Sequence, residues 1–121
     1  LQAVLQWLQD NHAVNVIDLA GFSFGAWIAA ALTSRSRTKW QPAHLLLVAP
    51  PVHYAGFQAL QLPAQTLVLQ GEEDEVVEPE AVYAWAASRV PVVALQRFSG
   101  ASHFFHGRLT ELKQAVIAYL S

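Results

Sequence analysis

One serine in this 121-residue sequence is especially well suited to chemistry, because it lies between two glycines. Gly21-Phe22-Ser23-Phe24-Gly25 has the pattern G-x-S-x-G, between a predicted strand and a predicted helix. A sharp turn of this kind lifts the Ser23 hydroxyl above the strand ends, where it can act as a nucleophile. The N–H of Phe24 lies at the positive end of the predicted helix, where an oxyanion can bind. The alternative is a Gly/Ser turn without catalysis, because the bare pattern also arises by chance.

A serine nucleophile needs a base, and the base needs an orienting carboxylate. In this type of elbow the chain order is serine, then acid, then histidine. Asp10 and Asp18 precede Ser23, which leaves Asp74 as the candidate aspartate. It lies in the acidic segment 71–77 (GEEDEVV), just past a predicted strand, where α/β sheets place their functional loops. The alternative for this segment is a solvated acidic loop.

Five histidines are candidates for the base: His12, His44, His53, His103 and His106. The first two fit capping or packing roles at the end of a helix and the start of a strand. The third follows a strand end and could approach the serine, but it precedes the candidate acid. Of the two that follow the acid, His103 is nearer to the preceding strand and is therefore the better candidate.

A metal site is the other chemistry that these side chains permit. Imidazoles and carboxylates can bind a metal together, but the sequence has neither an H-E-x-x-H pattern nor a cysteine ligand. We therefore expect no metal and no cofactor.

The hydrophobic pattern predicts the elements that must position these residues. Strands are predicted over 14–20, 44–49, 66–70 and 92–98. Helices are predicted over 1–11, 24–34, 79–89 and 110–120, with Pro79 in a first turn and Thr110 as an N-cap. Strands and helices alternate without an Asn-Gly or Asp-Gly hairpin signal, which favours parallel βαβ units. The expected class is α/β, with a mainly parallel sheet in a three-layer α/β/α arrangement.

Composition excludes several kinds of protein. The chain has 54% hydrophobic residues and a net charge of −2, which excludes a disordered chain. Charged residues make up 13%, about half of what a typical domain carries. The basic residues are scattered, so no nucleic-acid partner is expected. The longest apolar runs fall short of a membrane span, no signal peptide is evident and there is no cysteine, which favours a cytoplasmic protein without membrane contact.

Taken together, these motifs resemble the α/β-hydrolase superfamily, and within it the small lidless bacterial hydrolases of the dienelactone-hydrolase and short-chain carboxylesterase branch. The resemblance rests on four segments in family order: the elbow and helix 21–31, the strand end 48–52 (VAPPV), the acid loop 71–77 and the histidine loop 101–107. It implies that Ser23 is the nucleophile, Asp74 the orienting acid and His103 the general base. The implied activity is the cleavage of small-molecule carboxylic esters through an acyl-enzyme.

The sequence also departs from the family pattern. Family members have further strands before the elbow strand, and a loop after one of them supplies a second oxyanion N–H. We therefore expect residues 1–121 to be one partial domain, the C-terminal part of a hydrolase whose N-terminal strands are missing. Two alternatives remain: a thioesterase or peptidase with the same triad, or a non-catalytic half domain that needs a complementing N-terminal segment, a partner chain or a homo-oligomer.

Several side chains are expected near the nucleophile as candidates for a substrate pocket, although aromatic residues more often belong to the core than to a pocket. These candidates are Phe22, Pro51, His53, Tyr54 and Phe104.

Overall fold

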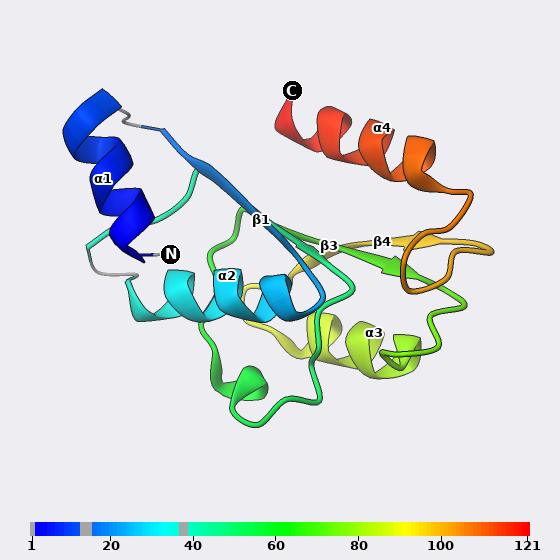
Figure 1. The fold of residues 1–121 in the computed structure, drawn as a ribbon. Coiled ribbons are helices and arrows are strands. Elements are labelled where there is room, and N and C mark those ends of the chain that lie inside the picture. The colour runs from blue at the N-terminus through cyan, green and yellow to red at the C-terminus, as the bar shows by residue number, and fades with distance from the viewer. Residues whose placement is uncertain (1, 13–15, 37–38) are drawn as a thin grey trace.

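The computed structural model describes residues 2–12, 16–36 and 39–121, and in them helices and strands alternate along the chain (Figure 1). The strands are β1 (Asp18–Phe22), β2 (His44–Val48), β3 (Thr66–Gly71) and β4 (Ala94–Phe98). The helices are α1 (Gln2–His12), α2 (Phe24–Arg35), α3 (Pro79–Ser88) and α4 (Leu109–Leu120), with a short 3-10 turn at Phe57–Ala59.

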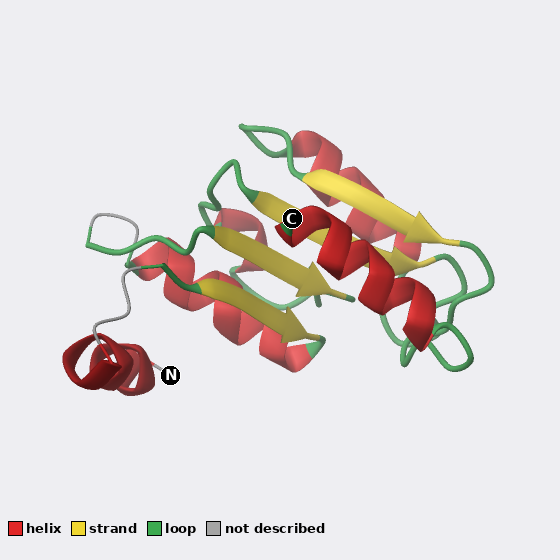
Figure 2. Ribbon diagram, turned by 90° about the horizontal axis from the view of Figure 1, so that it is seen from above, coloured by secondary structure: helices red, strands yellow, loops and turns green. Residues whose placement is uncertain are grey.

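The four strands form one parallel sheet in the order β1-β2-β3-β4. Helices α2 and α3 cover one face of this sheet and α4 covers the other (Figure 2). The predicted three-layer α/β/α fold is therefore confirmed. Because all the strands run the same way, the loops that follow them meet at one edge of the sheet.

The two central strands explain why the sheet can be covered on both faces. In β2, Leu45 and Leu47 belong to the core beneath α2 and α3, whereas Leu46 and Val48 belong to the core beneath α4. Every residue of β3 is buried. The continuous apolar runs in the sequence are therefore typical of strands buried on both sides, as predicted.

The predicted starts of two strands differ from the structure. Strand β1 begins at Asp18 rather than at residue 14, and residues 14 and 15 lie outside the described residues. Strand β4 begins at Ala94, where pairing with β3 starts: the N–H of the preceding Val93 donates to the carbonyl of Ala86 (3.4 Å), and Val92 is 68% exposed.

The prediction of Thr110 as the N-cap of the last helix is wrong. Helix α4 begins at Leu109 with Arg108 at the N-cap, and this cap makes no side-chain hydrogen bond to the helix backbone. The N–H of Leu112 donates to the carbonyl of Arg108 (3.1 Å), so the helical ladder already starts there. The guanidinium of Arg108 pairs instead with Glu111 across the first turn (2.9 Å).

None of the helices in the described part of the chain is long and apolar enough to span a bilayer.

Candidate active site

Ser23 lies at the tip of the turn that joins β1 to α2. Its backbone has φ 54° and ψ −116°, a left-handed conformation that side-chain-bearing residues rarely adopt. The Ser23 N–H donates to the carbonyl of Val48 (2.8 Å), which ties the turn to the end of β2. A methyl group on Gly21 would collide with the backbone carbonyl of Gly25, so glycine is required at the first position of the motif.

The hydroxyl of Ser23 does not cap its own helix. A serine at an N-cap usually accepts a hydrogen bond from a backbone N–H in the first turn, but Ser23 makes no such bond. Its Oγ lies 3.0 Å from Nε2 of His103, 80 residues further along the chain. The strained turn therefore directs the hydroxyl towards the imidazole rather than towards the helix.

His103 follows β4 in the loop 99–108 and is only 2% exposed. Its Nδ1 lies 2.8 Å from Oδ2 of Asp74. An ionised carboxylate only accepts hydrogen bonds, so Nδ1 carries the proton and donates it. This tautomer leaves the lone pair of Nε2 free to accept the hydrogen bond from the hydroxyl of Ser23.

Asp74 is buried even though its neighbours in the acidic loop are exposed. Its Oδ1 accepts hydrogen bonds from the N–H groups of Val76 (2.8 Å) and Val77 (2.7 Å), and its Oδ2 accepts one from Nε2 of Gln70 (3.1 Å) as well as that of His103. Burial raises the pKa of Asp74, but the hydrogen bonds from Val77, His103, Val76 and Gln70 outweigh it and leave the pKa below its ordinary value. The carboxylate is therefore held in its charged form, and a fully solvated loop does not describe this position.

Two backbone contacts bring the acid loop and the histidine loop together. The N–H of Glu73 donates to the carbonyl of Ala101 (3.0 Å), and the N–H of Glu72 donates to the carbonyl of Phe98 (3.0 Å). A methyl group on Gly71 would collide with the carbonyl of Ala101. The close approach of the two loops therefore requires a glycine at the end of β3, a requirement that the sequence pattern did not reveal.

Phe24 begins α2 directly after the serine. Within the described part of the chain, its N–H makes no hydrogen bond to another residue. It therefore remains available at the positive end of the helix, next to Ser23 Oγ.

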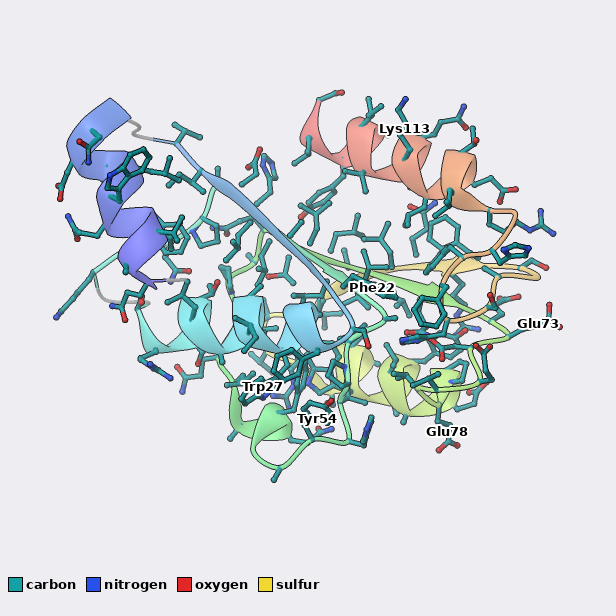
Figure 3. The ribbon with its side chains drawn as sticks, in the orientation of Figure 1. Phe22, Trp27, Tyr54, Glu73, Glu78 and Lys113 are labelled. Atoms are coloured by element: carbon teal, nitrogen blue, oxygen red, sulfur yellow. The ribbon has the colours of Figure 1, made fainter. Side chains whose placement is uncertain are left out.

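The aromatic candidates for a substrate pocket fall into two groups. Phe22 and Phe104 pack against each other (ring centroids 5.7 Å apart) and against His103 (5.1 and 5.0 Å). Tyr54 packs against Trp27 of α2 (6.0 Å) and against His53 (5.0 Å). Figure 3 shows Phe22 apart from the pair formed by Trp27 and Tyr54.

The remaining candidates lie as follows. Pro51 is buried in the loop after β2, whereas His53 and His106 are exposed and make no hydrogen bond to the triad within the described residues. His44 pairs with Asp18 (2.8 Å) at the beginnings of β2 and β1, at the other end of the sheet. The side chain of His12 lies outside the described residues. Among the described residues, no group of three histidines, aspartates or glutamates is placed to hold a metal ion.

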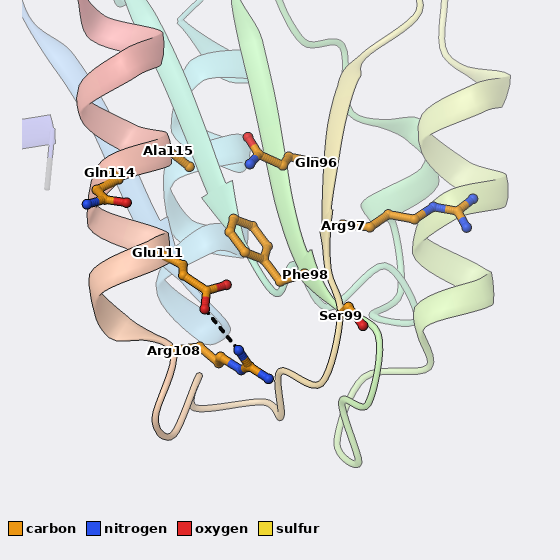
Figure 4. Close-up of a pocket in the computed structure, with 8 residues that line it drawn as sticks. All are labelled: Gln96, Arg97, Phe98, Ser99, Arg108, Glu111, Gln114 and Ala115. Carbon is orange, nitrogen blue, oxygen red and sulfur yellow. Dashed lines mark hydrogen bonds and ion pairs between the residues drawn. The ribbon is translucent and has the colours of Figure 1, made fainter.

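A cavity of about 610 Å³ lies away from the triad, along β4 and the first turns of α4 (Figure 4). The ion pair of Arg108 with Glu111 lies in it. Ser23, Asp74 and His103 do not line it, so this cavity is separate from the candidate site.

Comparison with solved structures gives the class of the chain. The structure matches an α/β serine hydrolase without a lid from Xanthomonas campestris (TM-score 0.89, 36% identity) over 98% of this chain and 53% of that one. It matches an α/β serine hydrolase homologue from Coxiella burnetii (TM-score 0.90, 43% identity) over 99% of this chain and 56% of that one. The chain therefore has the α/β-hydrolase fold and is similar in sequence to α/β serine hydrolases, as the motifs indicated.

Further matches also cover nearly all of this chain but only about half of the other protein. An uncharacterized protein of Rickettsia prowazekii, RP471, is 33% identical over 129 residues, covering 98% of this chain and 52% of that protein. The fold also matches the Pyrococcus furiosus esterase Pf2001 (TM-score 0.79, 19% identity) over 98% of this chain and 58% of that one. No family model matches the sequence. The chain spans about half the length of the relatives it matches.

Proposed function

We propose that this chain carries the catalytic triad of a serine hydrolase that cleaves carboxylic esters, with Ser23 as nucleophile, His103 as general base and Asp74 as the orienting acid. The observation that carries the proposal is the unbroken hydrogen-bonded series from Ser23 Oγ to His103 Nε2 (3.0 Å) and from His103 Nδ1 to Asp74 Oδ2 (2.8 Å). Each distance is within the reach that proton transfer requires.

The geometry supports a two-step reaction. Nε2 of His103 takes the hydroxyl proton as Ser23 Oγ forms a bond to the carbonyl carbon, and the carbonyl oxygen becomes an oxyanion. The free N–H of Phe24 is placed to stabilise this charge. His103 then gives its proton to the departing alcohol as the C–O bond of the ester breaks, which leaves an acyl group on Ser23.

Water completes the cycle by the same route. His103 takes a proton from water as the water oxygen attacks the acyl carbon, and it returns that proton to Ser23 Oγ as the acid leaves. Asp74 keeps Nδ1 protonated and stabilises the imidazolium in both steps without taking the proton itself. No step requires a metal ion or an organic cofactor.

The test is hydrolysis of a nitrophenyl ester by the protein at its full natural length, with a matched thioester and a matched anilide measured in parallel. We expect Ser23→Ala to abolish hydrolysis, because it removes the only atom that forms the acyl-enzyme. Ser102→Ala, a serine in the histidine loop, is the control and should retain activity. Hydrolysis at the wild-type rate by Ser23→Ala would refute the proposal. A clear preference for the thioester or the anilide would refute the ester as substrate and assign a thioesterase or a peptidase activity instead.

A further inference from the structure

Gln70 is the last-but-one residue of β3 and has no accessible surface. An amide buried among apolar strand residues costs free energy unless its polar atoms find partners. The side chain lies four residues before Asp74, on the strand that leads into the acid loop. A polar residue at this point of the core therefore needs an explanation.

The amide of Gln70 uses its nitrogen twice. Nε2 donates to Oδ2 of Asp74 (3.1 Å) and to the carbonyl oxygen of Gly71 (3.1 Å). Both partners are pure acceptors, so exchanging the nitrogen and oxygen of the amide would set oxygen against oxygen at both contacts. The chemistry of the neighbours thus determines the orientation of the side chain.

The carbonyl oxygen of Gln70 finds no hydrogen-bond partner among the described residues. Leaving a buried acceptor unpaired is unfavourable. A leucine would fill the same strand position without this cost. The amide is therefore poorly explained by its contribution to packing and well explained by its donation to the acid loop.

Oδ2 of Asp74, which accepts from Gln70, is also the oxygen that accepts from Nδ1 of His103. The other oxygen, Oδ1, is taken by the two backbone N–H groups of the loop. Gln70 thus approaches the carboxylate from the strand side while His103 approaches it from the histidine loop. Removing the amide leaves Oδ2 with His103 as its one remaining donor among the described residues, so the position of Oδ2 relative to the imidazole is less restrained.

We propose that Gln70 is a positioning residue of the triad, whose amide holds Oδ2 of Asp74 in line with Nδ1 of His103. This inference rests on the proposed function of the triad. Gln70 does not touch the reacting atoms, so it acts only through Asp74 and His103. The same donation favours the charged carboxylate, which the imidazolium needs as its partner during the reaction.

The experiment compares Gln70→Leu and Gln70→Glu with wild type, using kcat and KM for a nitrophenyl ester as functions of pH in the protein at its full natural length. We expect Gln70→Leu to lower kcat on the order of 10- to 100-fold with KM unchanged, because the carboxylate is no longer held in line. In Gln70→Glu, the new carboxyl can donate to Asp74 only while protonated. We therefore expect the activity of this variant relative to wild type to be highest at low pH and to fall as the new group ionises.

Gln65→Leu is the control, since it removes an amide from the residue directly before β3, at the opposite end from Gln70, where Nε2 donates to the carbonyl of Pro42 (2.9 Å). It should leave kcat and its pH profile unchanged. If the Gln70 variants lose activity only in proportion to their unfolded fraction, or if Gln70→Glu keeps the wild-type pH profile, the inference is overturned.

A second measurement is independent of catalysis. Proton NMR of the Nδ1–H resonance of His103 reports its hydrogen bond to Asp74 directly. We expect this resonance to shift or disappear in Gln70→Leu and to persist in Gln65→Leu; an unchanged resonance would overturn the inference. A different outcome separates the two proposals. If the wild type shows no Ser23-dependent ester hydrolysis but Gln70→Leu still changes the His103 resonance, the ester hydrolase is refuted and the positioning role of Gln70 stands.

Discussion

At the scale of single residues, the candidate site is organised around the carboxylate of Asp74. Four donors reach its two oxygens, and the side chain is removed from water. Hydrogen bonds to a charged acceptor are stronger than those between neutral groups. They offset the cost of burial and keep the carboxylate charged in the folded state. Both the candidate site and the stability of the fold therefore depend on the ionised side chain of Asp74.

This sharing predicts acid sensitivity. Because the pKa of Asp74 is lowered from 3.8 on folding, its contribution to stability is fully present above about pH 3.8 and is lost as the pH falls through the folded-state pKa. We expect Asp74→Asn to be less stable than wild type at neutral pH, with the difference shrinking in acid. Urea unfolding at a series of pH values measures it.

The control for this prediction is Glu73→Gln, which removes an exposed carboxylate from the same loop. It should change the free energy of unfolding little at any pH, as surface charges usually do. A difference between Asp74→Asn and wild type that stays constant or grows in acid would contradict the role of the ionised carboxylate in stability.

At the scale of elements, the strand-to-helix turn between β1 and α2 is the most constrained part of the site. Gly21 packs against the backbone of Gly25, and Ser23 adopts a positive φ that its side chain disfavours. The hydrogen bond from Ser23 to Val48 of the neighbouring strand holds this conformation. The local strain is therefore sustained by the packing of α2 on the sheet.

The two glycines of this turn should respond differently to substitution. We expect Gly21→Ala to destabilise the fold by about 3 kcal/mol, because its methyl meets backbone that cannot yield. The shift of Ser23 should also lower esterase activity about 100-fold. Thermal unfolding and ester hydrolysis measure the two effects.

Gly25→Ala is the matched control. A methyl there meets nothing within 4 Å among the described residues, and alanine favours a helix over glycine by roughly 0.5–1 kcal/mol. Its stability should be unchanged or slightly raised. If Gly21→Ala and Gly25→Ala lost stability and activity equally, the clash of a methyl group at Gly21 would not be the cause of the loss.

At the scale of the whole molecule, the distribution of burial is uneven. The central strands β2 and β3 are enclosed between α4 and the pair α2 and α3, whereas β1 and β4 form the two edges of the sheet in the described residues. Helix α4 has no buried residue, and Leu109 and Ile117 on it are more than half exposed. The low charge of the chain therefore corresponds to apolar surface as well as to a core.

This distribution predicts an order of amide hydrogen exchange. Amides of β2 and β3 should exchange slowest, because their hydrogen bonds open only when the core opens as a whole. Those of β4 and α4 should exchange faster. Exchange followed by NMR or mass spectrometry on the protein at its full natural length measures this order, and β4 protection equal to that of β3 would contradict it.

Much of the fold could be predicted from the sequence because it depends on local patterns. The apolar runs at 44–49 and 66–70 predicted buried parallel strands, and the structure confirms them. The start of α4 was predicted at the wrong residue, because the turn from Phe105 to Arg108, not the side chain of Thr110, begins the helix. Cap positions depend on backbone geometry that the composition of a segment does not specify.

The sequence by itself determined the class of fold and the order of the candidate serine, acid and histidine, since periodicity and short motifs are local properties. Only the tertiary structure decided that His103 rather than His53 or His106 lies against Ser23, and that Asp74 is buried although the three glutamates of its loop are exposed. It also brought Gln70 to the carboxylate. These contacts join separate loops at one edge of a parallel sheet, and their distances depend on how the strands and loops pack in three dimensions.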